Sequence, residues 1–170
     1  MSLARYLRAG KRPLLVGKPA TAKTSLLHEA AAECGMDMII TTPGIEDRCD
    51  IKGGMVPDFE RGIMRELPLE TMHRLLTATK PTLWFTDDLG NAPIDVQAGI
   101  KGLITKGGRL DRSNPNIIIA AATNRPGDKT GVGGLHESLR SEFDCAFLMP
   151  TPDCKDDPAG GVLFETWREF

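Results

Sequence analysis

Five short apolar segments alternate with longer segments of helical pattern along this chain of 170 residues, and this alternation constrains the fold most strongly. Hydrophobicity within the short segments is continuous, which is typical of parallel strands covered by helices on both faces. We therefore predict an α/β fold, a three-layer sandwich with a mostly parallel sheet of about five strands. The expected strands are Pro13–Val16, Met36–Thr41, Thr82–Thr86, Asn116–Ala122 and Asp144–Met149. The expected helices are Lys23–Cys34, Leu69–Thr79, Pro93–Lys106 and Gly134–Ser141.

Segment 43–67 is too long for an ordinary connection between a strand and a helix. Glycines and prolines punctuate it, so we predict an excursion that contains its own short hairpin or turn. These residues are Pro43, Gly44, Gly53, Gly54, Pro57 and Gly62.

A glycine-led loop follows the first expected strand and runs directly into the first expected helix. Backbone N–H groups of such a loop bind anionic phosphate oxygens, and we expect Lys23 to reach the β- and γ-phosphates and the Thr24 hydroxyl to bind Mg²⁺. Ala20 and Ala22 lack the freedom of glycine, so the loop should use backbone angles that alanine can adopt. The alternative is a Gly/Pro turn in which Lys-Thr occurs by chance. The candidate phosphate-binding residues are Gly17, Lys18, Pro19, Ala20, Thr21, Ala22, Lys23, Thr24 and Ser25.

Two acids, Asp87 and Asp88, end the apolar run that begins at Leu83. Asp87 is expected to hold Mg²⁺ through water, opposite Thr24, and Asp88 to orient and deprotonate the attacking water. A solvated turn or a helix cap is the alternative for the two acids. Asn124 follows another strand, at the end where open α/β sheets bind ligands, and would touch the γ-phosphate or position the water. Its alternative is a cap before Pro126.

These motifs resemble the AAA+ ATPases, and specifically their MoxR-like branch, from about Leu7 to Pro152. That branch carries a loop of the form GxPGxAKT, in which Ala22 is expected and Ala20 departs. In that branch the acidic pair is followed by a short link and an Ala-Pro helix start, which residues 87–93 match. The helix then carries a Val-Gln pair, which residues 96–97 match. The resemblance implies a P-loop NTPase fold, ATP and Mg²⁺ as ligands, and homo-oligomeric rings, usually hexamers, that remodel a protein partner. In such a ring, Gly53–Pro57 would face the pore, or would be a plain turn.

Three departures from the family bear on mechanism. Asp88 replaces the family's catalytic glutamate and is one methylene shorter, which predicts slow hydrolysis. Glu142 stands where the family has an arginine finger, so Arg140 is the nearby candidate, with a surface charge as the alternative. The family's helical lid has little room, since we assign 1–150 to the nucleotide-binding core and 151–170 to a linker and one helix at Gly161–Phe170. That helix would begin a lid or serve as a docking segment.

Composition limits which classes of partner and which cell compartment we expect for this protein. Lys and Arg number 21 against 23 Asp and Glu, so no strong nucleic-acid signal is present. The longest apolar run, Ile117–Ala122, is far shorter than the ~20 residues of a membrane span, and Leu14–Val16 is too short for the core of a secretory signal. The cysteines form no CxxC pair, which favours reduced thiols. We expect a cytoplasmic protein without a membrane partner.

The leading hypothesis is a Mg²⁺-dependent ATPase that remodels a protein partner. The alternative is a hydrolysis-impaired ATP-binding scaffold or assembly switch, which Asp88, Glu142 and the missing lid favour. A GTPase fits less well because no Asn-Lys-x-Asp motif follows the sheet, and a small-molecule kinase would need an arginine-bearing lid.

Overall fold

The computed structural model describes residues 2–45, 51, 53–125, 134–149 and 163–165. Within those residues, six strands form one sheet in the order β2-β5-β6-β1-β7-β8. The strands from β2 to β7 are parallel, and β8 is antiparallel to β7. The five parallel strands confirm the predicted α/β fold. Their bounds are β1 (Pro13–Val16), β2 (Asp37–Thr41), β5 (Thr82–Thr86), β6 (Ile117–Thr123) and β7 (Cys145–Leu148), followed by β8 (Leu163–Glu165).

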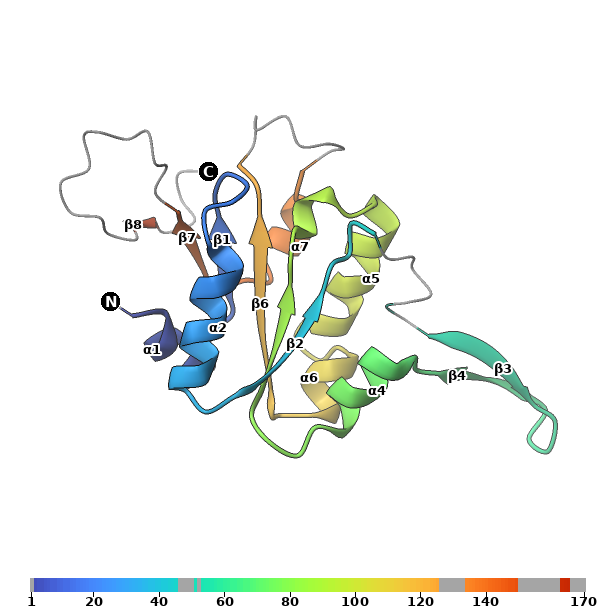
Figure 1. Ribbon diagram of the computed structural model, residues 1–170. Helices are drawn as coiled ribbons and strands as arrows, with labels where there is room; N and C mark the ends of the chain where they lie inside the picture. The colour runs from blue at the N-terminus through green and yellow to red at the C-terminus, as the bar shows by residue number, and fades with distance from the viewer. Residues whose placement is uncertain (1, 46–50, 52, 126–133, 150–162, 166–170) are drawn as a thin grey trace.

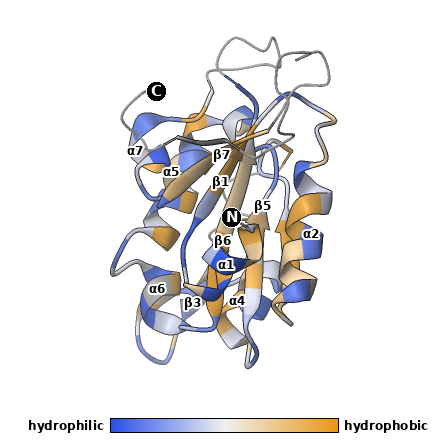
Figure 2. Cartoon of the chain, turned by 90° about the vertical axis from the view of Figure 1, so that its left-hand side faces the viewer, coloured by the Kyte–Doolittle hydropathy of each residue, from blue (hydrophilic) through white to orange (hydrophobic). Residues whose placement is uncertain are grey.

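Helices cover both faces of the sheet (Figure 1). Successive side chains of a strand point to opposite faces, so Leu14 of β1 packs in one hydrophobic cluster and Leu15 in the other. The Leu15 cluster includes residues of α1 (Leu3–Arg8) and α2 (Lys23–Glu33). The Leu14 cluster includes residues of α4 (Glu70–Thr77), α5 (Ile94–Ile104), α6 (Arg109–Ser113) and α7 (Glu137–Arg140). Figure 2 shows the hydrophobic strands lying between these two helical layers.

The helices differ from expectation in extent. The last of the predicted helices, over 134–141, is reduced to α7, while α1 and α6 were not predicted because neither is long enough to show a helical period. In the described part of the chain, no helix is both long and apolar enough to span a membrane.

The expected excursion contains an antiparallel hairpin of β3 (Gly54–Asp58) and β4 (Ile63–Leu67), which confirms the predicted hairpin. It projects from the body of the molecule (Figure 1). Gly53 precedes it at φ 95°, and a Cβ there would collide with the carbonyl oxygen of Leu67, so the position requires glycine. An ion pair of 2.7 Å between Glu66 and Arg109 joins β4 to α6. The exposed apolar residues of the hairpin are Met55, Val56, Phe59, Ile63, Met64 and Leu67.

The predicted helix over Gly161–Phe170 is wrong at Leu163–Glu165, which form β8. This strand pairs with β7 in the register Ala146↔Glu165 to Leu148↔Leu163. The apolar spacing favoured a helix, but the edge of β7 offers backbone hydrogen bonds that only an extended segment can complete. The other residues of the expected helix and its linker lie outside the described residues.

Candidate active site

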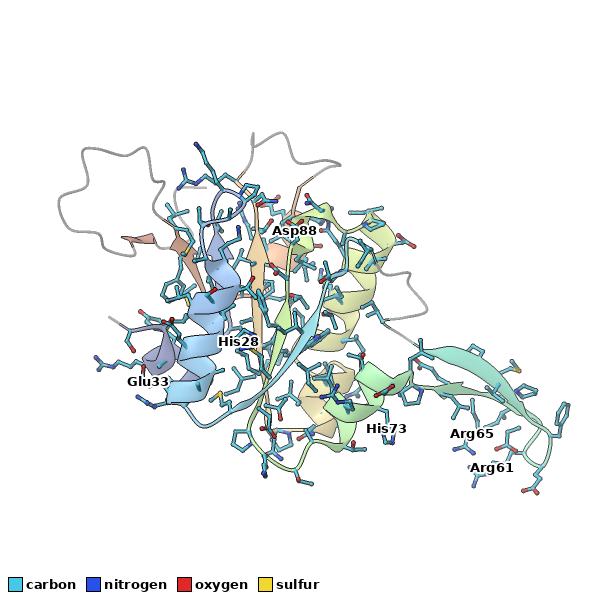
Figure 3. All side chains as sticks on the ribbon, viewed as in Figure 1. His28, Glu33, Arg61, Arg65, His73 and Asp88 are labelled. Carbon is cyan, nitrogen blue, oxygen red and sulfur yellow. The ribbon has the colours of Figure 1, made fainter. Side chains whose placement is uncertain are left out.

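Three strands end side by side at one edge of the sheet, which we call the loop edge: β1, β5 and β6. They are followed by Gly17, Asp87 and Asn124 respectively. The Gly17 N–H donates to the carbonyl oxygen of Thr123 at 3.2 Å, and the Asp87 N–H donates to that of Thr41 at 2.8 Å. Figure 3 shows Asp88 at this edge. The structure thus brings together the predicted loop, the acidic pair and Asn124.

The loop imposes left-handed backbone angles on two alanines. Ala20 has φ 61° and Ala22, which caps α2, has φ 59°. We expected angles that alanine can adopt, and the left-handed region is one that alanine adopts only at a cost. The left-handed region costs a non-glycine residue about 1–2 kcal/mol, and such residues gather at functional sites. In this loop Pro19, Ala20 and Ser25 are exposed and Gly17 is buried.

The ammonium group of Lys23 is held beneath the loop. Its Nζ donates to the carbonyl oxygens of Gly17 at 3.0 Å and Lys18 at 2.9 Å, and the residue is only 9% exposed. The Thr21 hydroxyl also donates to the Lys18 carbonyl oxygen, at 2.8 Å. A Cβ on Gly17 would lie 2.5 Å from the Met149 Cβ, so only glycine fits there. A cation is therefore fixed next to backbone N–H groups at a helix N-terminus, which is the chemistry of a phosphate site.

The two predicted magnesium ligands face one another. The Thr24 hydroxyl donates to Asp87 Oδ2 at 2.9 Å, and both residues are partly buried. Mg²⁺ prefers carboxylate and hydroxyl oxygens and keeps several waters, so a threonine and an aspartate beside a phosphate-binding loop suit it. These residues fit the ion that the motif implies.

Both carboxylate oxygens of Asp88 accept hydrogen bonds from side-chain amides. Asn124 Nδ2 lies 2.8 Å from Oδ1, and Asn91 Nδ2 lies 2.5 Å from Oδ2. Asp88 has φ 55°, a left-handed angle that Asp and Asn tolerate better than most residues. Sequence reasoning anticipated Asp88 and Asn124 but missed Asn91. The available signal was an amide three residues after the second acid.

Arg140 is the last residue of α7 and is half-buried. Glu142, which the resemblance to the AAA+ ATPases places at the finger position, accepts a hydrogen bond of 2.9 Å from the Thr105 hydroxyl. Thr105 follows the C-terminal end of α5, whereas the N-terminal end of α5 follows Asp88 and the short 3₁₀ helix η1 (Leu89–Asn91). Glu142 is therefore held within its own chain, and the finger role of Arg140 stays a prediction.

The cysteines within the described residues are free thiols, Cys34 and Cys145. Burial, followed by the neighbouring Asp144 carboxylate, raises the pKa of the Cys145 thiol to about 11. No group of three or more His, Cys, Asp and Glu that could hold a metal is found in the described part of the chain.

Comparisons with known proteins support the fold. No family model matches the sequence, and no curated protein matches it. Among solved structures, a candidate ATPase from Cytophaga hutchinsonii has a TM-score of 0.52 at 21% identity, over 88% of this chain and 44% of that one. The RuvB Holliday junction branch migration motor of Thermotoga maritima has a TM-score of 0.57 at 19% identity, over 87% of this chain and 41% of that one. The chain thus spans less than half the length of either neighbour. Together, the sheet order, the helices on both faces and these neighbours establish the α/β fold of the P-loop NTPases.

Proposed function

We propose that this protein binds ATP with Mg²⁺ at the loop edge and hydrolyses its terminal phosphoanhydride bond. The observation that carries the proposal is the hydrogen bond from Thr24 to Asp87, next to Lys23 under a strained loop. A turn with a chance Lys-Thr would not need to align a hydroxyl with a carboxylate that lies 63 residues further along the chain. The choice of adenine rests on the resemblance to the AAA+ ATPases.

Each group at the loop edge has a distinct part in this proposal. The backbone N–H groups of 17–25, among which Pro19 has none, and the Lys23 ammonium bind and orient the phosphates, while Thr24 and Asp87 hold the metal ion. Mg²⁺ supplies neutralisation of phosphate charge when bound. Asp88 accepts the proton of the attacking water, and the Asn124 amide orients the Asp88 carboxylate.

The finer reading is a MoxR-like AAA+ subunit that assembles into a homo-oligomeric ring and remodels a protein partner in the cytoplasm. A branch migration motor among the fold neighbours supports a motor function, and the projecting hairpin offers an exposed surface for a partner. Arg140 would then act on the nucleotide of the adjacent subunit. Particle size measured with and without ATP and Mg²⁺ tests this assembly, because a ring forms a much larger particle than one chain.

The decisive experiment is phosphate release by the purified chain, with Lys23→Ala as the blank. We expect Lys23→Ala to lower turnover about 10²–10³-fold, since a charge that stabilises the phosphates is lost. Lys80→Ala is the matched control, because Lys80 is an exposed lysine outside the site. If the wild type releases phosphate no faster than Lys23→Ala, the hydrolase proposal fails.

A hydrolysis-impaired ATP-binding scaffold is the second candidate, and the side chain of Asp88, which is one methylene shorter than glutamate, favours it. Calorimetric ATP binding that Lys23→Ala abolishes, without phosphate release, would support the scaffold. Asp88→Glu then asks whether reach limits hydrolysis. We expect about a tenfold rise in rate, because the longer side chain brings the carboxylate closer to the water. A lower rate would show that reach is not the limitation.

A further inference from the structure

Asp88 is bonded by two amides that come from different parts of the fold. Asn124 extends from the end of β6 and reaches Oδ1, whereas Asn91 ends η1 and reaches Oδ2. One hydrogen bond leaves a carboxylate free to turn about its side-chain torsions. A second donor on the other oxygen fixes the plane of the group.

Asn91 is itself held in place by its surroundings. Its N–H donates to the Asp88 carbonyl oxygen at 2.9 Å, which closes the turn of η1, and Leu89 of that turn is fully buried. Gly44, in the loop after β2, lies near Asn91: a Cβ added to Gly44 would be 3.6 Å from the Asn91 Cβ. The donor therefore sits on a supported element.

Gly90 brings this element against the strand that carries the other donor. A Cβ at Gly90 would collide with the Thr123 hydroxyl, so glycine allows η1 to approach the end of β6 closely. Thr123 directly precedes Asn124. The same contact thus sets the position of both amides relative to Asp88.

We propose that Asn91 is a positioning residue that, together with Asn124, fixes the orientation of the Asp88 carboxylate for attack by water. The inference rests on the proposed hydrolase function and deepens it. Orientation matters more for Asp88 than for a longer acid, since a short side chain cannot compensate for a misplaced carboxylate. Asn91 donates a hydrogen bond to Asp88 and, among the hydrogen bonds of the described residues, takes no part in those of Lys23 or in that between Thr24 and Asp87. It therefore acts on turnover and leaves nucleotide binding intact.

The kinetic test compares three variants of the full chain. Asn91→Ala removes the donor, and we expect kcat to fall about tenfold with the KM for ATP within twofold of wild type. Asn91→Asp keeps the size of the side chain but presents an acceptor to Asp88, so kcat should fall at least as far. Asn116→Ala is the matched control: Asn116 is also half-buried and donates its amide, to the Ala78 carbonyl oxygen at 3.2 Å, before β6 begins. It should keep wild-type kcat.

A second readout needs no turnover. In nitrogen-15 spectra of the nucleotide-free chain, Asn91→Ala identifies the Asn91 side-chain amide signal, and Asp88→Ala should shift that signal and speed its hydrogen exchange. A purely structural role would lower the melting temperature of the Asn91 variants while Asn91→Asp kept wild-type kcat.

The outcomes separate the two proposals. If the wild type shows no Lys23-dependent turnover, the hydrolase function fails before any Asn91 variant is tested, and this inference fails with it. If the wild type turns over and Asn91→Asp matches it, or if Asp88→Ala leaves the Asn91 amide signal unmoved, the inference alone is overturned.

Discussion

The loop edge and the β3–β4 hairpin are built from different kinds of contact. At the loop edge, segments from distant parts of the chain meet through hydrogen bonds, such as Thr24 to Asp87 and Asn124 to Asp88. The hairpin is one continuous segment that projects outward, and Figure 3 shows Arg61 and Arg65 on it, far from Asp88.

The two regions also differ in backbone strain and in the exposure of their side chains. The loop edge holds non-glycine residues at left-handed angles, which persist only where surrounding contacts determine them. In the hairpin, Met55 is 60% exposed and Phe59 is 89% exposed. The comparison teaches that strained backbone angles occur where distant segments meet and chemistry is proposed, while local pairing holds a segment whose apolar side chains are exposed.

The largest expected difference concerns the two phenylalanines Phe85 and Phe59. Phe85 in β5 is fully buried, so Phe85→Ala should lower the free energy of unfolding by about 3–5 kcal/mol. Phe59→Ala should change it by less than about 0.5 kcal/mol, since the ring is already in water. Urea unfolding followed by circular dichroism measures both. A large loss for Phe59→Ala would mean that the hairpin tip is covered in solution.

Thiol alkylation sharpens the contrast between sheet and hairpin. Burial raises the pKa of Cys145 from 9.0 to about 11, so at pH 8 it should hold about 100-fold less thiolate than an unshifted thiol. A cysteine introduced by Met55→Cys, at an exposed position of the hairpin, provides the unshifted thiol for comparison. Peptide mass spectrometry should show slow labelling of Cys145 that accelerates as pH rises toward 11. Equal rates at pH 8 would contradict the burial of β7.

Alanine in place of glycine tests the close approach at the loop edge. Gly90→Ala should destabilise the fold by about 1–3 kcal/mol, because the added Cβ collides with the Thr123 hydroxyl. A Cβ at Gly54 in the hairpin would meet no atom of the described residues within 4 Å, so Gly54→Ala should be nearly neutral. Thermal unfolding of the pair measures the difference, and similar losses would remove the distinction between the two regions.

The smallest expected effect is on the attachment of the hairpin. Arg109→Gln breaks the ion pair with Glu66 and should cost about 0.2–1 kcal/mol, because both side chains are partly exposed. Proteolysis between β3 and β4 should become faster than in wild type. A loss above 2 kcal/mol would show that the pair determines more than the hairpin's orientation.

The strands were predictable because buried parallel strands have a continuous apolar pattern that can be recognised in the sequence alone, as in β5 and β6. The hairpin was predictable from glycine and proline punctuation. Three features were not: the left-handed alanines, the bond from Asn91 to Asp88, and β8. The bond left a local signal, an amide three residues after the second acid, whereas β8 depends on the open edge of β7, which lies elsewhere in the sequence.

By itself, the amino-acid sequence determined the α/β class, the order of strands and helices along the chain, and the residues that follow β1, β5 and β6. Only the tertiary structure decided which of those side chains bond to one another, because parallel pairing aligns strand ends that lie tens of residues apart. Asp88 and Asn124, which are 36 residues apart and joined by a hydrogen bond, are one such pair.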